Sequence, residues 1–117
     1  MFIATVIVSV ILALILTLSA AMKLRRQPQI VDSIHGVIGV PLERFWVLAG
    51  LELAAAAGLV IGLWLAPLGI AAAIGAVAYF IGAIIAHVRV GDTKGIANPM
   101  FPLALSTAAL VLRSLSA

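Results

Sequence analysis

The chain alternates between long apolar stretches and short polar connections. Four apolar stretches stand out, at residues 2–22, 45–65, 68–88 and 99–115. Each is close to the roughly 20 residues with which an α-helix crosses the hydrocarbon core of a bilayer. We therefore expect an all-α integral membrane protein, in which residues 1–117 form one compact bundle of four transmembrane helices.

The connections between these stretches differ in character. Ala66 and Pro67 predict a tight turn between the second and third spans, and residues 89–98 form a polar loop. Between the first two spans, Pro28 begins a short amphipathic pattern. Its apolar side is formed by Ile30, Val31, Ile34, Val37 and Ile38, and its polar side by Gln29, Asp32, Ser33 and His35. This pattern predicts a short helix that lies flat in the membrane interface.

Basic residues favour one orientation of the predicted bundle. Six of the seven Lys and Arg residues lie in segments 23–44 and 89–98, and only Arg113 lies toward the opposite side. Because basic loops are retained in the cytoplasm, both segments are predicted to be cytoplasmic and both termini to lie outside the cell membrane. Trp46 and Trp64, at opposite ends of the second span, agree with this placement, since Trp is enriched at both membrane interfaces.

Composition excludes several classes of function. Hydrophobic residues make up 65% of the chain and charged residues 9%, whereas a soluble domain has about 25% charged residues. No basic face is present on which nucleic acid would bind. The absence of Cys excludes disulfides and thiol chemistry, and two His residues leave few ligands for a metal site. His35 and His87 are predicted to lie on the same side, but their spacing does not require haem, so haem is not expected.

Small residues recur at every fourth position in two spans, and this spacing allows helix backbones to approach closely. The second span carries Gly50, Ala54, Gly58 and Gly62, and the third carries Ala78, Gly82 and Ala86. The rows predict close packing within the bundle. The alternative is an interface with a second copy or with a partner membrane protein.

Glu52 is the one acidic residue inside a predicted span. An ionised carboxylate that faces lipid at this depth costs on the order of 3 kcal/mol, so Glu52 is expected to face the bundle interior. It either fixes helix packing through an ion pair or hydrogen bond, or it contacts a proton, a quinone or a substrate. The sequence is consistent with both interpretations of Glu52.

Other polar residues of the predicted spans lie at depths similar to that of Glu52. A turn at Ala66–Pro67 places Glu52 level with the part of the third span that carries Tyr79. Thr17 of the first span and Ser106 of the fourth span lie at comparable depths. We therefore predict a polar pocket that opens to the cytoplasm. Its candidate ligand or proton-handling residues are Glu52, His87, Tyr79, Lys23, Thr17 and Ser106.

Several motifs resemble those of the DoxX-like family of small membrane proteins. They are Ser19-Ala20-Ala21-Met22-Lys23-Leu24 at the end of the first span, Gly39-Val40-Pro41 before the second, Gly50-Leu51-Glu52-Leu53 within it, and the run from Gly82-Ala83 through His87 and Arg89 to Gly91-Asp92. The resemblance covers nearly the whole chain. Ala20 stands where relatives often have Gly.

The resemblance implies a compact four-helix membrane bundle, with Lys23, Glu52 and His87 on the polar positions of the family's motifs. Relatives include subunits of a thiosulfate:quinone oxidoreductase, components of membrane-associated oxidative-stress complexes, and distant eukaryotic channel-assembly chaperones. These roles imply an accessory subunit that binds a partner protein, a lipid or a quinone.

The sequence is consistent with two other functions. A quinone-linked oxidoreductase component would use Glu52 and His87 to handle protons. It would need electrons from a partner, because the chain has no Cys and no flavin or nucleotide motif. A small multidrug-type transporter shares the size, the four spans and a buried Glu, but such transporters carry that Glu in the first span, which has none here. The sequence therefore assigns no enzymatic reaction.

Overall fold

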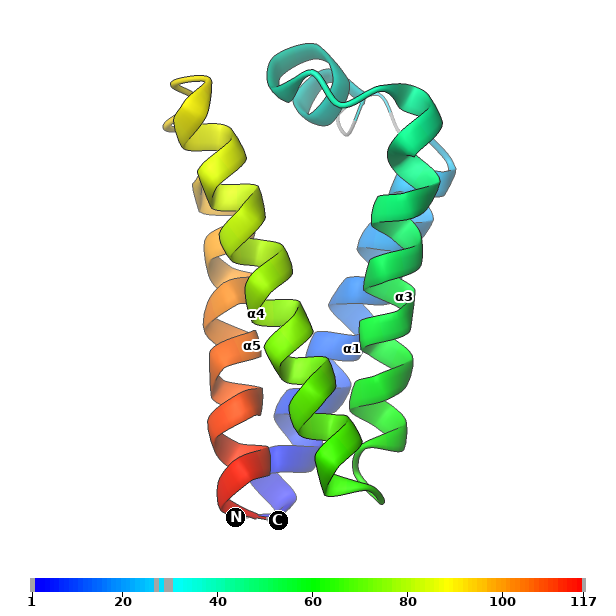
Figure 1. Cartoon of the computed structure of the whole chain (residues 1–117), viewed down its shortest axis with the longest axis vertical. Helices are drawn as coiled ribbons and strands as arrows, with labels where there is room; N and C mark the ends of the chain where they lie inside the picture. Colours follow the sequence, from blue (N-terminus) through cyan, green and yellow to red (C-terminus); the bar gives the residue numbers. More distant parts are fainter. Residues whose placement is uncertain (1, 27, 29–30, 117) are drawn as a thin grey trace.

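The computed structural model describes residues 2–26, 28 and 31–116, and every regular element in these residues is helical. The four long helices are α1 (Phe2–Leu24), α3 (Phe45–Ile61), α4 (Ala66–Arg89) and α5 (Ala97–Leu115). Two short elements lie between α1 and α3: a π-helical segment η1 (Val31–Ile38) and a 3₁₀ turn η2 (Leu42–Arg44). Both ends of the described chain lie at the same end of the molecule (Figure 1).

The turn between α3 and α4 is set by local backbone chemistry. Pro67 lies in the first turn of α4, where a missing backbone N–H costs little, so α4 begins at Ala66. Residues 62–65 therefore form the turn. The turn predicted at Ala66–Pro67 is displaced from the observed one, because proline fits the start of a helix as well as it fits a turn.

The long helices form two pairs. α1 packs along α3, and α4 packs along α5. α3 and α4 lie close to each other near the turn that joins them and separate toward the opposite end (Figure 1). We refer to these two ends of the molecule as the narrow end and the wide end. All four long helices contribute to one apolar core, which contains Leu12, Ala13, Leu16, Ala56, Leu59, Ala73, Phe80 and Ala109.

Small residues allow α3 and α4 to meet at the narrow end. A Cβ on Gly62 would overlap the backbone of Gly69, and a Cβ on Gly58 would lie 2.8 Å from the Cβ of Ala72. Half of the predicted small-residue row of α3 thus packs within the molecule. Gly50 and Ala54, in the other half of the row, are exposed.

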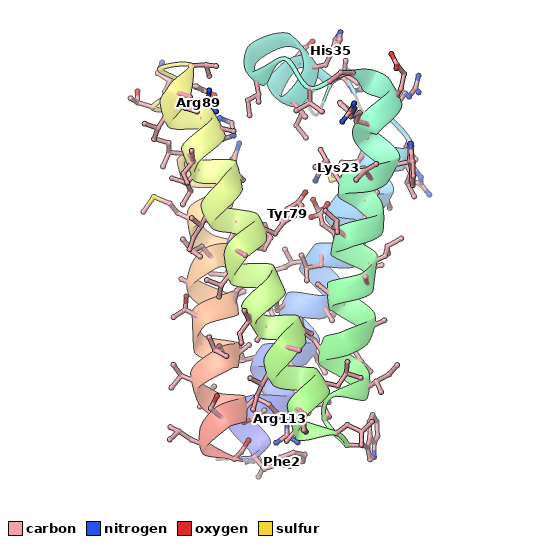
Figure 2. The ribbon with its side chains drawn as sticks, in the orientation of Figure 1. Phe2, Lys23, His35, Tyr79, Arg89 and Arg113 are labelled. Atoms are coloured by element: carbon pink, nitrogen blue, oxygen red, sulfur yellow. The ribbon has the colours of Figure 1, made fainter. Side chains whose placement is uncertain are left out.

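Arg113 joins the elements of the narrow end. Its side chain is buried, and its Nε donates a hydrogen bond to Gly62 O at 2.9 Å. The guanidinium carbon lies 5.7 Å from the centre of the Phe2 ring, a cation–π distance. Figure 2 shows Arg113 and Phe2 together at the end of the molecule opposite His35 and Arg89. Arg113 therefore holds α5 to α1 and to the turn after α3.

The outer surface of the long helices is largely apolar. α1 and α4 are long and apolar enough to cross a membrane, and α3 is a shorter apolar helix. Large apolar side chains are exposed on every long helix, for example Ile7, Leu51, Ile74 and Val111. Such a surface is unfavourable in water and is typical of helices in contact with lipid.

The short helix predicted before the second span corresponds to η1. Ile34 and Ile38 are partly buried, whereas Asp32 and His35 are exposed, so the segment has the predicted two-sided character. Its predicted first residues, 29–30, lie outside the described residues. Figure 1 places η1 at the wide end, between the ends of α3 and α4.

Candidate binding cavity

The separation of the two helix pairs leaves a cavity of about 620 Å³ at the wide end. This volume is within the range of about 300–1,000 Å³ that is typical of small-molecule sites. Side chains from α1, η1, α3, α4 and the start of α5 surround it. Most of the wall is apolar and includes Ile15, Met22, Leu48, Leu51, Ala78, Gly82, Ala83 and Ala86. Of the six predicted site residues, four line it: Lys23, Glu52, Tyr79 and His87.

Lys23 and Glu52 form a buried ion pair between α1 and α3. Lys23 Nζ lies 2.7 Å from Glu52 Oε1, and the two side chains are only 7% and 1% exposed. Lys23 Nζ also donates to Ser19 Oγ at 2.7 Å, one helical turn earlier on α1. Both oxygens of Glu52 are buried, and neither has a partner in full hydrogen-bond geometry among the described residues. The pair is therefore held chiefly by charge, and each member compensates the other in an apolar environment.

Tyr79 approaches this ion pair from the other helix pair. Its side chain points from α4 across the cavity toward Lys23 (Figure 2), and its hydroxyl interacts with the carboxylate of Glu52. The Tyr79 ring stands edge-on to Phe80, with ring centres 5.2 Å apart and planes at 87°. Because Phe80 is buried in the core, this contact fixes the direction of Tyr79.

His87 lies at the rim of the cavity and is held by the loop that follows α4. Its Nδ1 is 2.8 Å from Asp92 Oδ2, and the Gly95 N–H donates to Asp92 Oδ1 at 3.1 Å. The hydrogen bond with His87, followed by the one from Gly95, lowers the pKa of Asp92 below its ordinary value. A Cβ on Gly95 would overlap Asp92 and lie 2.5 Å from His87 Nδ1, so a larger residue there would have to displace the Asp92 carboxylate and the His87 ring.

Thr17 and Ser106 do not line this cavity. The Thr17 hydroxyl donates to Ala13 O at 2.8 Å, and the residue borders a separate, shallower hollow between α1 and α3. Ser106 is fully buried and donates to Pro102 O at 2.7 Å. Both hydroxyls bond to their own helix, as Ser and Thr commonly do in apolar surroundings. Of the six residues of the predicted pocket, Thr17 and Ser106 therefore lie outside the cavity.

Three further residues have roles that the sequence reasoning missed. Ser19 lies four residues before Lys23, and this helical spacing is a signal that points to their contact. Asp92 follows His87 by five residues across a helix end, where no periodic pattern applies. The sequence indicates Arg113 only as an orientation signal, yet it is buried and bonds to backbone carbonyls. In the described ranges, no group of three or more His, Cys, Asp or Glu side chains is placed to hold a metal ion.

The comparison with known protein families gives one match. Residues 7–109 match the DoxX-like family, and the chain belongs to this family. The matched range includes every residue named above as lining the cavity. No curated protein and no solved structure matches the chain. The resemblance seen in the sequence motifs is thus confirmed, and family membership together with the apolar helices indicates a membrane protein.

Proposed function

We propose that the protein is an accessory membrane subunit whose cavity binds a small lipid-like or quinone ligand and whose surface binds a partner membrane protein or a second copy of the chain. The observation that carries the ligand proposal is the cavity itself, an apolar chamber of about 620 Å³ with a buried ion pair on one wall and a tyrosine that approaches it from α4. An apolar site with a few convergent polar groups is typical of small-molecule recognition. The chain lacks Cys, so any redox chemistry at this site requires a partner.

A second candidate function is a quinone-linked oxidoreductase component. It is favoured by the placement of Glu52, Tyr79 and His87 around the same cavity, since these are the residue types that transfer protons. Purification with a redox-active partner distinguishes this function from a purely accessory one.

Filling the cavity should remove the ligand. Gly82 lines the cavity, and a Cβ there meets no atom within 4 Å, so this position has room to begin a larger side chain and Gly82→Leu is chosen to fill the open space. We expect the amount of lipid or quinone that co-purifies in mild detergent to fall by about tenfold or more, measured by mass spectrometry of the extracted small molecules.

Gly75→Leu is the matched control for this experiment. Gly75 lies on the same helix, a Cβ there also meets nothing within 4 Å, and it does not line the cavity. This variant should retain the co-purifying molecule, and both variants should keep wild-type thermal stability. Equal ligand content in the two variants would place the ligand elsewhere or show that none is bound.

We further propose that all four long helices cross the cell membrane, with the wide end in the cytoplasm and both termini outside. This orientation is supported by the exposed basic residues of the wide end, Arg25, Arg26, Arg44, Arg89 and Lys94. In contrast, Arg113 at the narrow end is buried. Basic residues exposed at one end are typical of the cytoplasmic side.

Single cysteines test this topology, because the chain contains no Cys of its own. We expect Arg25→Cys and Thr93→Cys to react with a membrane-impermeant maleimide only from the cytoplasmic side, and Leu65→Cys only from the outside. The unsubstituted chain gives the background. Reaction of Arg25→Cys and Leu65→Cys from the same side would contradict the crossing of α3.

A further inference from the structure

The charged groups on the wall of the cavity are already paired. Lys23 Nζ lies 2.7 Å from Glu52 Oε1, so the formal charges of this pair sum to zero. His87 at the rim is bonded to Asp92 at 2.8 Å. Within the described part of the chain, the cavity therefore presents polar groups to a ligand but no uncompensated lysine or glutamate.

A charged head group would have to break the buried pair. An anion that bound Lys23 would compete with Glu52, which is 1% exposed and would then be left as a buried unpaired carboxylate. A cation would have to reach the oxygens of Glu52, and both of these have almost no exposed surface. Both kinds of head group are therefore disfavoured by the same ion pair.

Lys23 and Ser19 still have hydrogen-bond donors that a ligand could use. A lysine ammonium has three N–H groups. One is bonded to Ser19 Oγ and a second faces Glu52 Oε1, so one remains for a ligand. The Ser19 hydroxyl, which accepts from Lys23, keeps its own O–H as a donor. A carbonyl, ester or ether oxygen fits this set, because each of these accepts hydrogen bonds without carrying charge.

Resting on the proposed ligand-binding function, we infer that the cavity selects an uncharged amphiphile whose head group accepts hydrogen bonds, and that the Lys23–Glu52 pair excludes anionic and cationic head groups. The apolar wall accommodates the tail. The opposite wall on α4 carries Tyr79, Phe80 and His87 and, between them, small residues with at most one methyl group, which leave room for the ligand: Ala78, Gly82, Ala83 and Ala86. A quinone and an uncharged glyceride share this chemistry.

Three photoreactive probes with identical tails test the selection. Each carries a diazirine in the same alkyl chain and ends in a carboxylic acid, its methyl ester or a primary amine. The full chain is reconstituted in liposomes at about pH 9, where the acid is ionised and the amine is largely protonated. We expect the ester to label the α4 wall of the cavity at least about tenfold more than the acid or the amine, with peptides quantified by mass spectrometry.

Two variants show whether the ion pair sets this preference. Glu52→Gln leaves Lys23 without its counter-ion, so the acid should become the preferred probe. The double variant Lys23→Met with Glu52→Gln keeps the cavity uncharged, so it should still exclude both charged probes, with weaker ester labelling because a donor is lost. If the single variant does not fold, the wild-type preference for the ester over both charged probes still tests the selection, and weaker ester labelling of the double variant tests the donation by Lys23.

The outcomes separate this inference from the proposed function. If no probe labels the cavity wall, or if labelling persists in Gly82→Leu, the proposed binding function is wrong. If the acid or the amine labels the wild-type wall as well as the ester does, and Gly82→Leu blocks all three, the cavity binds ligands but the inferred selection is wrong. Competition of ester labelling by a decyl-benzoquinone or by a monoglyceride then distinguishes a quinone ligand from a neutral lipid.

Discussion

Replacing Glu52 with Gln is expected to destabilise the folded protein by about 3–5 kcal/mol, because removal of one member of a buried ion pair leaves the other charge uncompensated. Lys23 is 7% exposed and lies 2.7 Å from the carboxylate, so its ammonium would be left in an apolar setting. Gln has nearly the same shape as Glu, so the change tests charge and not packing. Unfolding by SDS titration in mixed micelles, followed through the fluorescence of Trp46 and Trp64, gives the free energy.

The double variant Lys23→Met with Glu52→Gln is the control. Replacing both members of a buried pair with uncharged side chains of similar size is often neutral or stabilising, so this variant should recover most of the lost stability. Wild-type stability in Glu52→Gln alone would contradict the prediction and would mean that the Lys23 ammonium reaches water at the end of α1.

Replacing Gly62 with Ala is expected to prevent the native packing of α3 against α4, although it adds only one methyl group. The new Cβ would overlap the backbone of Gly69, which has no side chain to move aside. Overpacking of a core typically costs about 1–3 kcal/mol, and an overlap with backbone should exceed this range. The carbonyl of Gly62 also accepts from Arg113, so a shift of the turn would break that bond. Size-exclusion chromatography in mild detergent should show loss of the monodisperse protein.

Gly50→Ala makes the same chemical change on the same helix at a place where a Cβ meets no atom within 4 Å. It should be stabilising by about 0.4–1 kcal/mol, because Ala loses less backbone entropy than Gly when a helix forms. A Gly62→Ala protein that elutes and unfolds like Gly50→Ala would show that α3 and α4 do not approach at Gly62 and Gly69.

Several features of this protein follow from the sequence without a structure. The apolar stretches locate the four long helices to within a few residues at most ends, because runs of apolar residues of this length form helices in a membrane. The motif around Lys23, the motif around Glu52 and the segment that ends at Asp92 identify the family. The expectation that Glu52 is buried also follows from the sequence, since an exposed carboxylate at that depth is unfavourable.

Other features depend on how the helices are rotated and tilted, and the tertiary structure alone decides them. A helix turns by about 100° per residue, so two residues at equal depth on different helices face each other only if packing orients both. Thr17 lies on an exposed side of α1 for this reason, whereas Lys23, six residues later, lies on a buried side next to Glu52. The depth of a residue along its helix follows from the sequence, but the neighbouring helix that its side chain faces does not.

The cavity also depends on how the helices pack in the tertiary structure. The rows of small residues on α3 and α4 allow close contact along their whole length, yet among the glycines of these rows only Gly58 and Gly62 make it. The helices meet where Arg113 and the short turn hold them, and they separate toward the wide end (Figure 1). Local sequence determines which backbones are able to approach each other. Where they separate is decided by contacts between residues far apart in the chain, such as Arg113 with Gly62, and these exist only once the helices are packed.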